Sequence, residues 1–316
     1  MESSVEILLS TYNGEKYLNA QLDSILQQDY ANWKLVIRDD GSKDATLSVI
    51  AEYVSKYPDK INLYKDTDGN LGFSNSFTKL LKQSTADYVM YCDQDDYWLP
   101  NKISTMLAVM LEQEVLLPTK AHVVFSDLQV ADDALDIIAP SFLKRMHYVS
   151  GAGMQIFFLK NYVPGCNILF NRKLVQQAMK TENIINLHDH WLLMVCGAVG
   201  KLTFIDKPLM KYRMHDANTI GFLQPNVSFF KQIKLFFADN LKYGFANKKY
   251  RKLLYSKNIL QMQNICERLG SDVSKDAIAF SEIGSSNYFA RKFRNIFKPY
   301  IMETSLLKYV TYIICF

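Results

Sequence analysis

The feature that most constrains this sequence is a regular alternation of strand-like and helix-like segments over its first 92 residues. Short apolar runs, typical of buried strands, alternate with longer segments whose apolar residues recur at helical spacing. We expect strands at residues 5–10, 34–38, 61–65 and 88–92, and helices at 15–28, 44–56 and 73–82, with Asp44 as an N-cap. Because strands separated by helices usually pair in parallel, this order predicts an α/β fold with a mainly parallel, doubly wound sheet.

The rest of the chain divides into two parts. Up to residue 224 the sequence continues with mixed elements, and we expect strands at 122–126, 166–170 and 202–205 and helices at 172–179 and 190–199. From residue 225 the pattern becomes that of basic amphipathic helices, at 229–241 and at 248–269, the second ended by Gly270. We therefore predict a domain at 1–224 and a C-terminal helical extension at 225–316, with the boundary near 222–226.

The charge follows the same division. Residues 1–224 hold 21 Lys and Arg against 26 Asp and Glu, a net charge of −5, whereas residues 225–316 hold 15 against 6, a net charge of +9. Lysines interleaved with aromatic residues suit the surface of an anionic bilayer. They also suit RNA, or a helix that docks on the first domain. We expect membrane-surface association and no nucleic-acid partner.

Composition excludes several classes of protein. The chain has 316 residues, of which 49% are hydrophobic and 22% charged, so a disordered, collagenous or coiled-coil protein is excluded. No apolar run reaches the length of a membrane span, and the N-terminus lacks the basic start of a secretory signal. Its five cysteines form no CxxC pair, which indicates a reducing, cytoplasmic setting.

Three polar clusters come directly after expected strands, at residues 10–14, 39–42 and 93–96. Any one of them could be only a turn, since Asp, Asn, Gly and Ser are the usual turn residues. However, ligands of open α/β sheets bind at the carboxyl ends of the strands, where all three clusters are predicted to lie. Neither a GxxxxGK[ST] phosphate loop nor a GxGxxG motif is present, which weighs against an NAD enzyme.

The third cluster is the most specific. Asp93 and Asp95 are two residues apart on an extended backbone, so their carboxylates point the same way and repel each other unless a cation faces them. Oxygen ligands of this kind suit Mg²⁺ or Mn²⁺, with a substrate diphosphate completing the coordination. The alternative is a solvated acidic turn. The neighbouring Tyr91, Tyr97 and Trp98 make an apolar setting for such a turn.

These clusters, with the segments 70–74 and 93–98, resemble in order the motifs of family 2 glycosyltransferases, and the likeness covers roughly residues 4–221. The resemblance implies the A-type nucleotide-diphospho-sugar transferase fold and inverting transfer from a nucleotide sugar. It implies that Asp93 and Asp95 hold the metal. The donor-binding residues that it implies are Thr11, Tyr12, Asn13, Asp39, Asp40, Asn70, Gly72, Ser74, Asp93 and Arg213.

Later segments, at 164–167, 188–192 and 212–221, resemble the rhamnosyltransferase-like branch of that family. This resemblance implies transfer of L-rhamnose from dTDP-rhamnose to a lipid-linked oligosaccharide in bacterial surface polysaccharide (O-antigen or capsule) synthesis. The protein would then be peripheral on the inner face of the plasma membrane. The residues expected on the acceptor side are Trp98, His188, His190 and Trp191, although the branch more often has Trp at position 190.

Inverting transfer is a single in-line displacement that needs a general base for the acceptor hydroxyl. Asp189 is the candidate base, although an Asp at this position also caps a helix. His215 is either a third metal ligand, a diphosphate contact or structural, and Arg213 pairs either with phosphate or with a structural carboxylate. Three alternatives stay open: the same fold with a UDP-hexose donor, a sugar nucleotidyltransferase, and a non-catalytic nucleotide-sugar-binding subunit.

Overall fold

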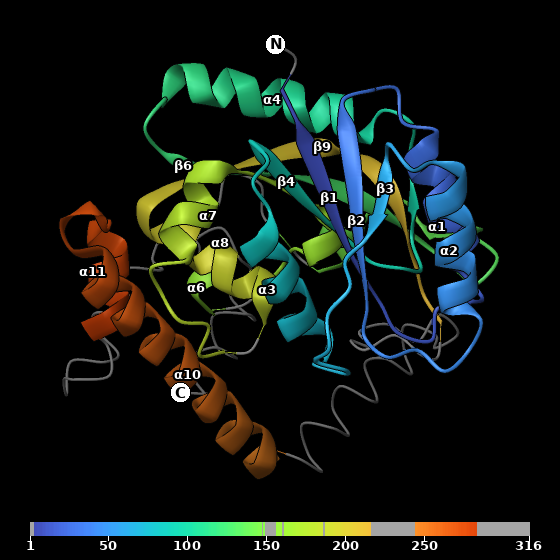
Figure 1. Cartoon of the computed structure of the whole chain (residues 1–316). Helices are drawn as coiled ribbons and strands as arrows, with labels where there is room; N and C mark the ends of the chain where they lie inside the picture. The colour runs from blue at the N-terminus through green and yellow to red at the C-terminus, as the bar shows by residue number, and fades with distance from the viewer. Residues whose placement is uncertain are drawn as a thin grey trace.

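The computed structural model describes residues 3–146, 148, 156–159, 161–185, 187–215 and 244–282, and they form an α/β fold around one large sheet (Figure 1). The sheet has the strand order β3-β2-β1-β4-β8-β6-β9-β5, and β7 pairs with β6. Its strands are β1 (Val5–Thr11), β2 (Trp33–Asp39), β3 (Ile61–Leu63), β4 (Tyr88–Cys92), β5 (Tyr97–Trp98), β6 (Ala121–Ala131), β7 (Ile137–Ala139), β8 (Ile168–Asn171) and β9 (Gly200–Arg213).

Helices cover this sheet in two groups. The elements are α1 (Leu18–Leu26), α2 (Thr46–Lys56), α3 (Phe73–Gln83), α4 (Lys102–Leu116), α5 (Phe142–Arg145), α6 (Ile156–Leu159), α7 (Arg172–Ala178), α8 (His188–Val199), α10 (Gly244–Leu269) and α11 (Lys275–Ser281), with the 3₁₀ turns η1 (Gly165–Asn167) and η2 (Gly270–Asp272). Helices α1 and α2 pack together on one flank, and α3, α7 and α8 form the second group (Figure 1). The predicted α/β class is therefore confirmed.

The sheet is more mixed than the strand–helix alternation predicts. Strands β1 to β4 pair in parallel, and so do β6 and β9, but β8 runs antiparallel between β4 and β6. The predicted strands at 122–126 and 202–205 are only the first halves of β6 and β9. Register shifts between Ser126 and Gln129 separate those halves from the continuations, where the polar residues Asp206 and Lys207 of β9 interrupt the apolar pattern.

The structure adds one helix to those predicted and corrects the start of another. Helix α4 was not predicted from the sequence. Helix α2 begins at Thr46 rather than at residue 44, and its N-cap is Ala45, which makes no side-chain capping bond. The carboxylate of Asp44 nonetheless accepts a hydrogen bond from the Thr46 amide at 3.0 Å, so it supports the first turn from one residue further out.

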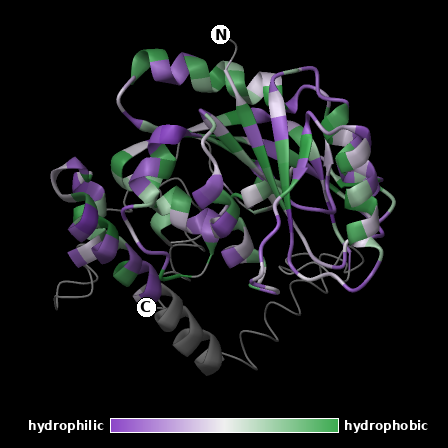
Figure 2. Ribbon diagram, viewed as in Figure 1, coloured by the Kyte–Doolittle hydropathy of each residue, from purple (hydrophilic) through white to green (hydrophobic). Residues whose placement is uncertain are grey.

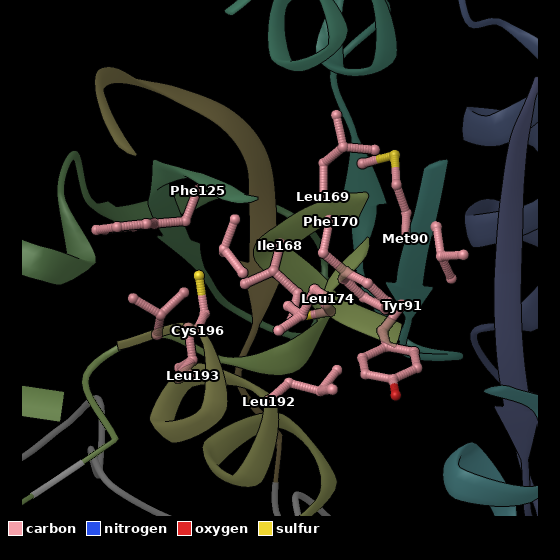
Figure 3. Packing of buried hydrophobic residues seen from close by; sticks show 14 of the residues in the cluster. Met90, Tyr91, Phe125, Ile168, Leu169, Phe170, Leu174, Leu192, Leu193 and Cys196 are labelled. Atoms are coloured by element: carbon pink, nitrogen blue, oxygen red, sulfur yellow. The ribbon is translucent and has the colours of Figure 1, made fainter. Parts of the chain in front are cut away.

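The core lies between the sheet and the helices. The central strands have hydrophobic stretches interrupted by hydrophilic residues, and the helices alternate in hydropathy (Figure 2). Figure 3 shows residues of β4, β6 and β8 meeting α7 and α8, with Tyr91 and Phe170 facing Leu192. All three side chains have no exposed surface. Helix α8 is buried on every side, so it is fixed firmly at the point where its N-terminus reaches the edge of the sheet.

The predicted second basic helix is confirmed as α10, and it ends at Gly270, whose φ of +58° favours glycine. Its last turns pack on the sheet domain, because Met262 and Ile265 are buried and Gln261 accepts a hydrogen bond from the Ile184 amide at 2.6 Å. The predicted helix at 229–241 and the boundary at 222–226 lie outside the described residues. Among the residues described, no helix combines the length and the apolar character needed to cross a bilayer.

Candidate active site

Parallel pairing brings the three polar clusters to one edge of the sheet. Thr11 at the end of β1 is in register with Asp39 at the end of β2, and Leu9 is in register with Cys92 at the end of β4. The loops that follow these strands therefore start side by side. This is the arrangement that the sequence predicts for a ligand site.

The first two clusters are joined by hydrogen bonds. Asp39 accepts from the Thr11 hydroxyl at 2.9 Å and from the Ser42 hydroxyl at 2.6 Å. Asn13, whose φ is +49°, accepts from the Lys43 amide through its side-chain oxygen at 2.8 Å. Tyr12 keeps 47% of its surface exposed. Together these contacts hold the polar groups of the two loops in place beside one aromatic side chain that is open to solvent.

The third cluster is tied to the first through Gln94. Its side-chain amide accepts from the Tyr12 backbone N–H at 2.9 Å and donates to the Tyr12 carbonyl at 3.1 Å. A Cβ at Gly14 would lie 2.3 Å from the Gln94 side-chain oxygen, so a side chain at position 14 would displace the Gln94 amide. The sequence motif thus uses Gln94 to hold the loops together, leaving the acids on either side of it to face the site.

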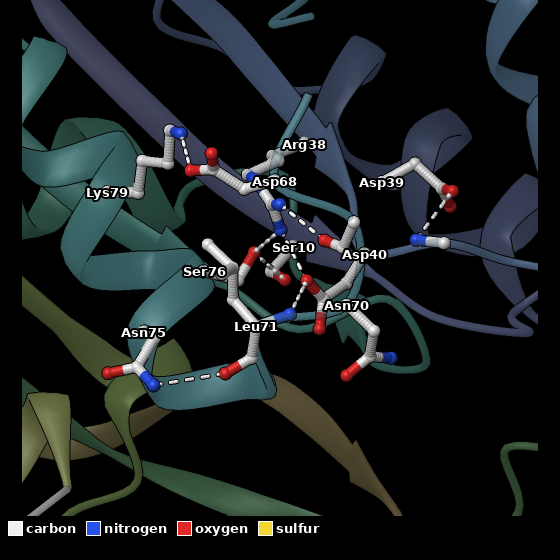
Figure 4. A network of polar contacts seen from close by, with 12 residues as sticks. Ser10, Arg38, Asp39, Asp40, Asp68, Asn70, Leu71, Asn75, Ser76 and Lys79 are labelled. Carbon is white, nitrogen blue, oxygen red and sulfur yellow. Dashed lines mark hydrogen bonds and ion pairs between the residues drawn. The ribbon is translucent and has the colours of Figure 1, made fainter. Parts of the chain in front are cut away.

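Asp40 is buried in a network of its own (Figure 4). Its carboxylate pairs with the Arg38 guanidinium and accepts from the backbone N–H groups of Leu71 and Gly72 at 2.7 and 2.8 Å. Arg38 also pairs with Asp66 at 2.7 Å, and this holds the pKa of Asp66 down to about 2. The network thereby fixes the 69–72 loop, which carries the predicted donor residues Asn70 and Gly72.

Ser74 follows that loop in the first turn of α3 and is 7% exposed. Its hydroxyl is buried and has no partner among the described residues. Asn70 accepts a hydrogen bond from the Gly72 amide at 3.2 Å. The φ of Gly72 is +75°, a conformation that lets the chain turn into the helix.

The acidic turn at residues 93–96 is short of donors. Asp96 is fully buried, and one of its oxygens accepts the Arg213 amide at 3.1 Å, while the other has no partner among the residues that the structure describes. Burial and the neighbouring Asp95 raise the pKa of Asp93 to about 7. Burial, Asp95 and Asp93 likewise raise the pKa of Asp96. Such mutual repulsion is what a bound cation would relieve.

Lys102 lies under this turn as the first residue of α4 and has no exposed surface. Its ammonium donates to the Cys166 carbonyl at 2.7 Å and lies 4.2 Å from the centre of the Trp98 ring. Burial lowers the pKa of Lys102 to about 8. No carboxylate of the described residues lies within ion-pair distance of it, so it offsets the acidic turn from a distance.

Arg213 and His215, from the end of β9, reach the other side of the turn. His215 Nε2 lies 2.9 Å from Asp95 Oδ2, and its ring stacks on Tyr17 with centroids 4.4 Å apart. Arg213 donates through Nε to the Asp95 carbonyl at 2.7 Å, and its guanidinium carbon lies 4.8 Å from the centre of the Tyr17 ring. The structure thus joins three residues that the sequence assigned separately to metal and donor. Tyr17 is a fourth member of this group, and no sequence motif identified it.

Asp189 is the second residue of α8 and is 8% exposed. It accepts hydrogen bonds from the His190 amide at 2.7 Å and from the Asn161 side-chain amide at 2.8 Å. It is the first-turn acid of α8, but the N-cap is Leu187, so Asp189 does not cap the helix. Its charge contributes to the raised pKa values of Asp93 and Tyr91, which places it near the acidic turn.

The residues expected on the acceptor side are largely internal. Trp98 is fully buried, and Trp191 donates from its indole N–H to the Thr181 hydroxyl at 2.9 Å. His190 is bonded to the Phe157 carbonyl at 2.7 Å. His188 stacks on Phe77 with centroids 4.4 Å apart and is 5% exposed, and burial lowers its pKa. All four are therefore buried and contact protein groups.

The donor set at the turn fits a divalent cation. Asp93, Asp96 and Cys166 bring ligand atoms within 4.8 Å of one another, and Asp95 adds a carboxylate from the same turn. The buried oxygen of Asp96 that lacks a partner is the strongest sign that something is bound there. Sequence reasoning left out Asp96 and Cys166. Asp96 could have been found as the last acid of its motif, but Cys166 lies 70 positions further along the chain, outside that motif.

Comparisons with known proteins agree with this geometry. Residues 6–178 match the sequence profile described as Glycosyl transferase family 2. The chain is 28% identical over 257 residues to "dTDP-rhamnosyl transferase RfbG" of Shigella flexneri, covering 77% of this chain and 81% of that protein. It is 32% identical over 111 residues, 35% of this chain and 42% of that protein, to "UDP-Glc:alpha-D-GlcNAc-diphosphoundecaprenol beta-1,3-glucosyltransferase WfgD" of Escherichia coli.

A solved structure shares the fold. It is the mannosyltransferase PcManGT from Pyrobaculum calidifontis, in complex with GDP-Man and Mn²⁺. The TM-score is 0.54 at 15% identity, over 93% of this chain and 83% of that one. The predicted A-type glycosyltransferase fold is therefore confirmed.

Proposed function

This chain belongs to glycosyl transferase family 2 and is a glycosyltransferase, and on that premise we propose that it transfers L-rhamnose from dTDP-rhamnose, with inversion, to a lipid-linked oligosaccharide. One observation carries the chemistry: a Cβ on Gly165 would lie 3.1 Å from the Asp189 Cβ, and the ligand atoms of the next residue, Cys166, and of Asp93 and Asp96 in the acidic turn lie within 4.8 Å of one another, so Asp189 and the turn belong to one site. The choice of rhamnose is supported by similarity to the rhamnosyl transferase of Shigella flexneri.

The donor nucleotide is assigned to the polar groups of the first two clusters. The polar atoms of Thr11, Asn13 and Asp39 are held there by hydrogen bonds, and the exposed ring of Tyr12 is available to stack on the base. Asn70, Gly72 and Ser74 form the adjoining wall. Asp40 supports that wall, because its oxygens are already taken by Arg38 and by two backbone N–H groups.

The diphosphate is assigned to the acidic turn with Mg²⁺ or Mn²⁺. Asp93 and Asp95 would hold the ion, with His215 beside Asp95 and with Asp96 and Cys166 behind them. When bound, the ion neutralises the negative charge that develops on the leaving nucleoside diphosphate. Arg213 braces the turn through the Asp95 carbonyl and the Asp96 carboxylate.

Asp189 is assigned as the general base. A carboxylate in the first turn of a helix is stabilised by the helix dipole, and this one is also hydrogen-bonded by two N–H groups. It takes the proton from the acceptor hydroxyl as that oxygen attacks the anomeric carbon. The nucleoside diphosphate leaves from the opposite face, which inverts the configuration. His188, beside it, is the acceptor-side residue that we retain, and Trp98, His190 and Trp191 support the site from inside.

The acceptor is assigned from similarity to a known enzyme, and the location from the charge of the C-terminal region. The name of the similar Escherichia coli enzyme specifies a diphosphoundecaprenol-linked acceptor. The net charge of +9 over residues 225–316 suits the anionic inner face of the plasma membrane. We therefore place the enzyme in the cytoplasm, peripheral to that membrane, in O-antigen or capsule synthesis, with residues 1–224 catalytic and with 225–316, apart from the turns of α10 that pack on the sheet domain, at the membrane surface.

One alternative donor has its own support. Similarity to the glucosyltransferase that uses UDP-Glc favours a UDP-hexose. The sugar nucleotidyltransferase and the non-catalytic subunit are not retained, because the family is one of glycosyltransferases.

A donor panel tests the proposal. Purified full-length enzyme would be titrated with dTDP-rhamnose and UDP-hexoses by calorimetry, with Mn²⁺ and with EDTA, and transfer to a prenyl-diphosphate oligosaccharide would be measured. We expect dTDP-rhamnose to bind tightly only with Mn²⁺ and to be consumed. Preference for a UDP-hexose would replace the donor, and metal-independent binding would overturn the role of the acidic turn. The variant Asp189→Asn should bind donor normally and lose about 1,000-fold in kcat.

A further inference from the structure

The carboxylate of Asp189 is held by a residue from a distant loop. Asn161 donates its side-chain N–H to Asp189 Oδ2 at 2.8 Å, and the His190 backbone N–H donates to Oδ1 at 2.7 Å. Each oxygen therefore has one fixed donor. Because the donors act on different oxygens, together they set the rotation of the carboxylate about its Cβ–Cγ bond.

Asn161 is itself fixed. Its side-chain oxygen accepts the Val163 backbone N–H at 3.0 Å, and this contact decides which end of the amide faces Asp189. A few residues further along the loop, a Cβ placed on Gly165 would lie 3.1 Å from both the Asp189 Cβ and His188 Nε2. The loop is therefore pressed against the start of α8, and little room is left for the carboxylate to rotate.

We propose that Asn161 is the positioning residue of the general base: it aims the remaining lone pairs of Asp189 at the acceptor hydroxyl. The inference rests on the proposed function, in which Asp189 removes that proton. A base that rotates away from its proton loses rate, although substrate binding is unchanged. Asn161 touches neither reacting atom in this assignment and acts only through Asp189.

Two substitutions separate this role from a purely structural one. Asn161→Ala removes the donor. Asn161→Asp keeps the size of the side chain and the acceptor for the Val163 amide, but it sets a second carboxylate against Asp189. If Asn161 acts through its donated hydrogen bond, kcat falls by about 10- to 100-fold in Asn161→Ala and further in Asn161→Asp, while KM for the donor stays within about twofold. A structural role predicts the reverse order, with Asn161→Asp the milder change.

A double-mutant cycle sharpens the test. In the Asp189→Asn background, Asn161→Ala should cost no more than about twofold, because the group that it positions is gone. An equal loss in both backgrounds would overturn the inference. The matched control is Asn264→Ala, which removes another loop-holding asparagine, the acceptor of the Glu182 amide. It should leave kcat unchanged.

The two proposals fail differently. If Asp189→Asn retains turnover, the assignment of the base is wrong and the proposed mechanism falls with it. If Asp189→Asn is inactive but Asn161→Ala and Asn161→Asp, shown by thermal melts to be folded, both have wild-type kcat, only the role of Asn161 is wrong.

Discussion

Two acidic turns leave the same edge of the sheet, and they differ in how their carboxylates are satisfied. After β2, Asp39 accepts hydrogen bonds from two hydroxyls and two backbone N–H groups, and Asp40 is paired with Arg38 and two more N–H groups. After β4, Asp93 and Asp96 face each other and Asp95, and burial and repulsion raise the pKa of both.

The difference separates two uses of the same residue type. A carboxylate whose lone pairs are taken by the protein stabilises the fold and has little left for a ligand. Carboxylates that are packed together without enough hydrogen-bond donors repel one another and destabilise the fold, and a bound cation would offset this repulsion. We therefore expect substitution of Asp40 in the β2 turn to lower stability, and substitutions in the β4 turn to lower activity.

The largest effect is expected in the β4 turn. Asp95→Asn should lower metal-dependent transfer by about 1,000-fold, because it removes a ligand charge where the diphosphate is held. Its melting temperature without metal should be equal to or above that of the wild type, since repulsion with Asp93 and Asp96 is relieved. Product formation and thermal melts would be measured together. A variant that melts earlier and keeps its activity would place Asp95 among the structural carboxylates.

A smaller effect is expected in the β2 turn, on stability instead. Asp40→Asn leaves the buried Arg38 without one partner and sets an N–H group against the loop amides, at a cost of about 3 kcal/mol in the free energy of unfolding. Urea unfolding would measure it. The matched control is Asp68→Asn, which removes the exposed ion pair with Lys79 and should cost less than about 1 kcal/mol.

The sequence assigned Asp40 to the donor, so the opposite result is informative. If Asp40→Asn has the wild-type free energy of unfolding but loses donor binding, Asp40 acts on the ligand rather than on stability. The β2 and β4 turns would then have the same use, and the distinction drawn between them would be wrong.

The smallest effect is on the pH dependence of stability. The pKa of Asp66 is lowered from 3.8 to about 2, chiefly by its hydrogen bonds with Arg38. A lowered pKa stabilises the folded state above the unfolded value, and the contribution is lost as pH falls from about 4 toward 2. Asp66→Asn should therefore lose about 1–2 kcal/mol near neutral pH and converge with the wild type near pH 2. If the free energies of unfolding of Asp66→Asn and the wild type differ by the same amount from pH 4 to pH 2, Asp66 does not have the lowered pKa.

Much of the fold was predictable because its signals are local. The apolar runs of β1, β2 and β4 and the helical spacing of α1 and α3 lie within single segments, and all were predicted. The antiparallel direction of β8 and the full length of β9 were not. Both depend on pairing with strands far away in the chain, and a strand's own residues do not encode the direction of its partner.

The candidate site shows the same limit. The motifs identified Asp93, Asp95 and Asp189, but not the residues that set their environment. Lys102 reaches Cys166 across 64 positions, and Arg213 reaches Asp96 across 117. Lys102 lies outside every element predicted from the sequence, and Arg213 was predicted to pair with phosphate or with a structural carboxylate, but its partner was not identified.

The sequence by itself determined that this chain forms an α/β sheet with acidic, oxygen-rich turns at one edge, since strand order and turn composition are written locally. Only the tertiary structure decided which acids are used up by the fold and which are left for a ligand. The physical reason is that the energy of a buried carboxylate depends on its hydrogen-bond donors and neighbouring charges, and folding brings these from residues that the chain keeps far apart.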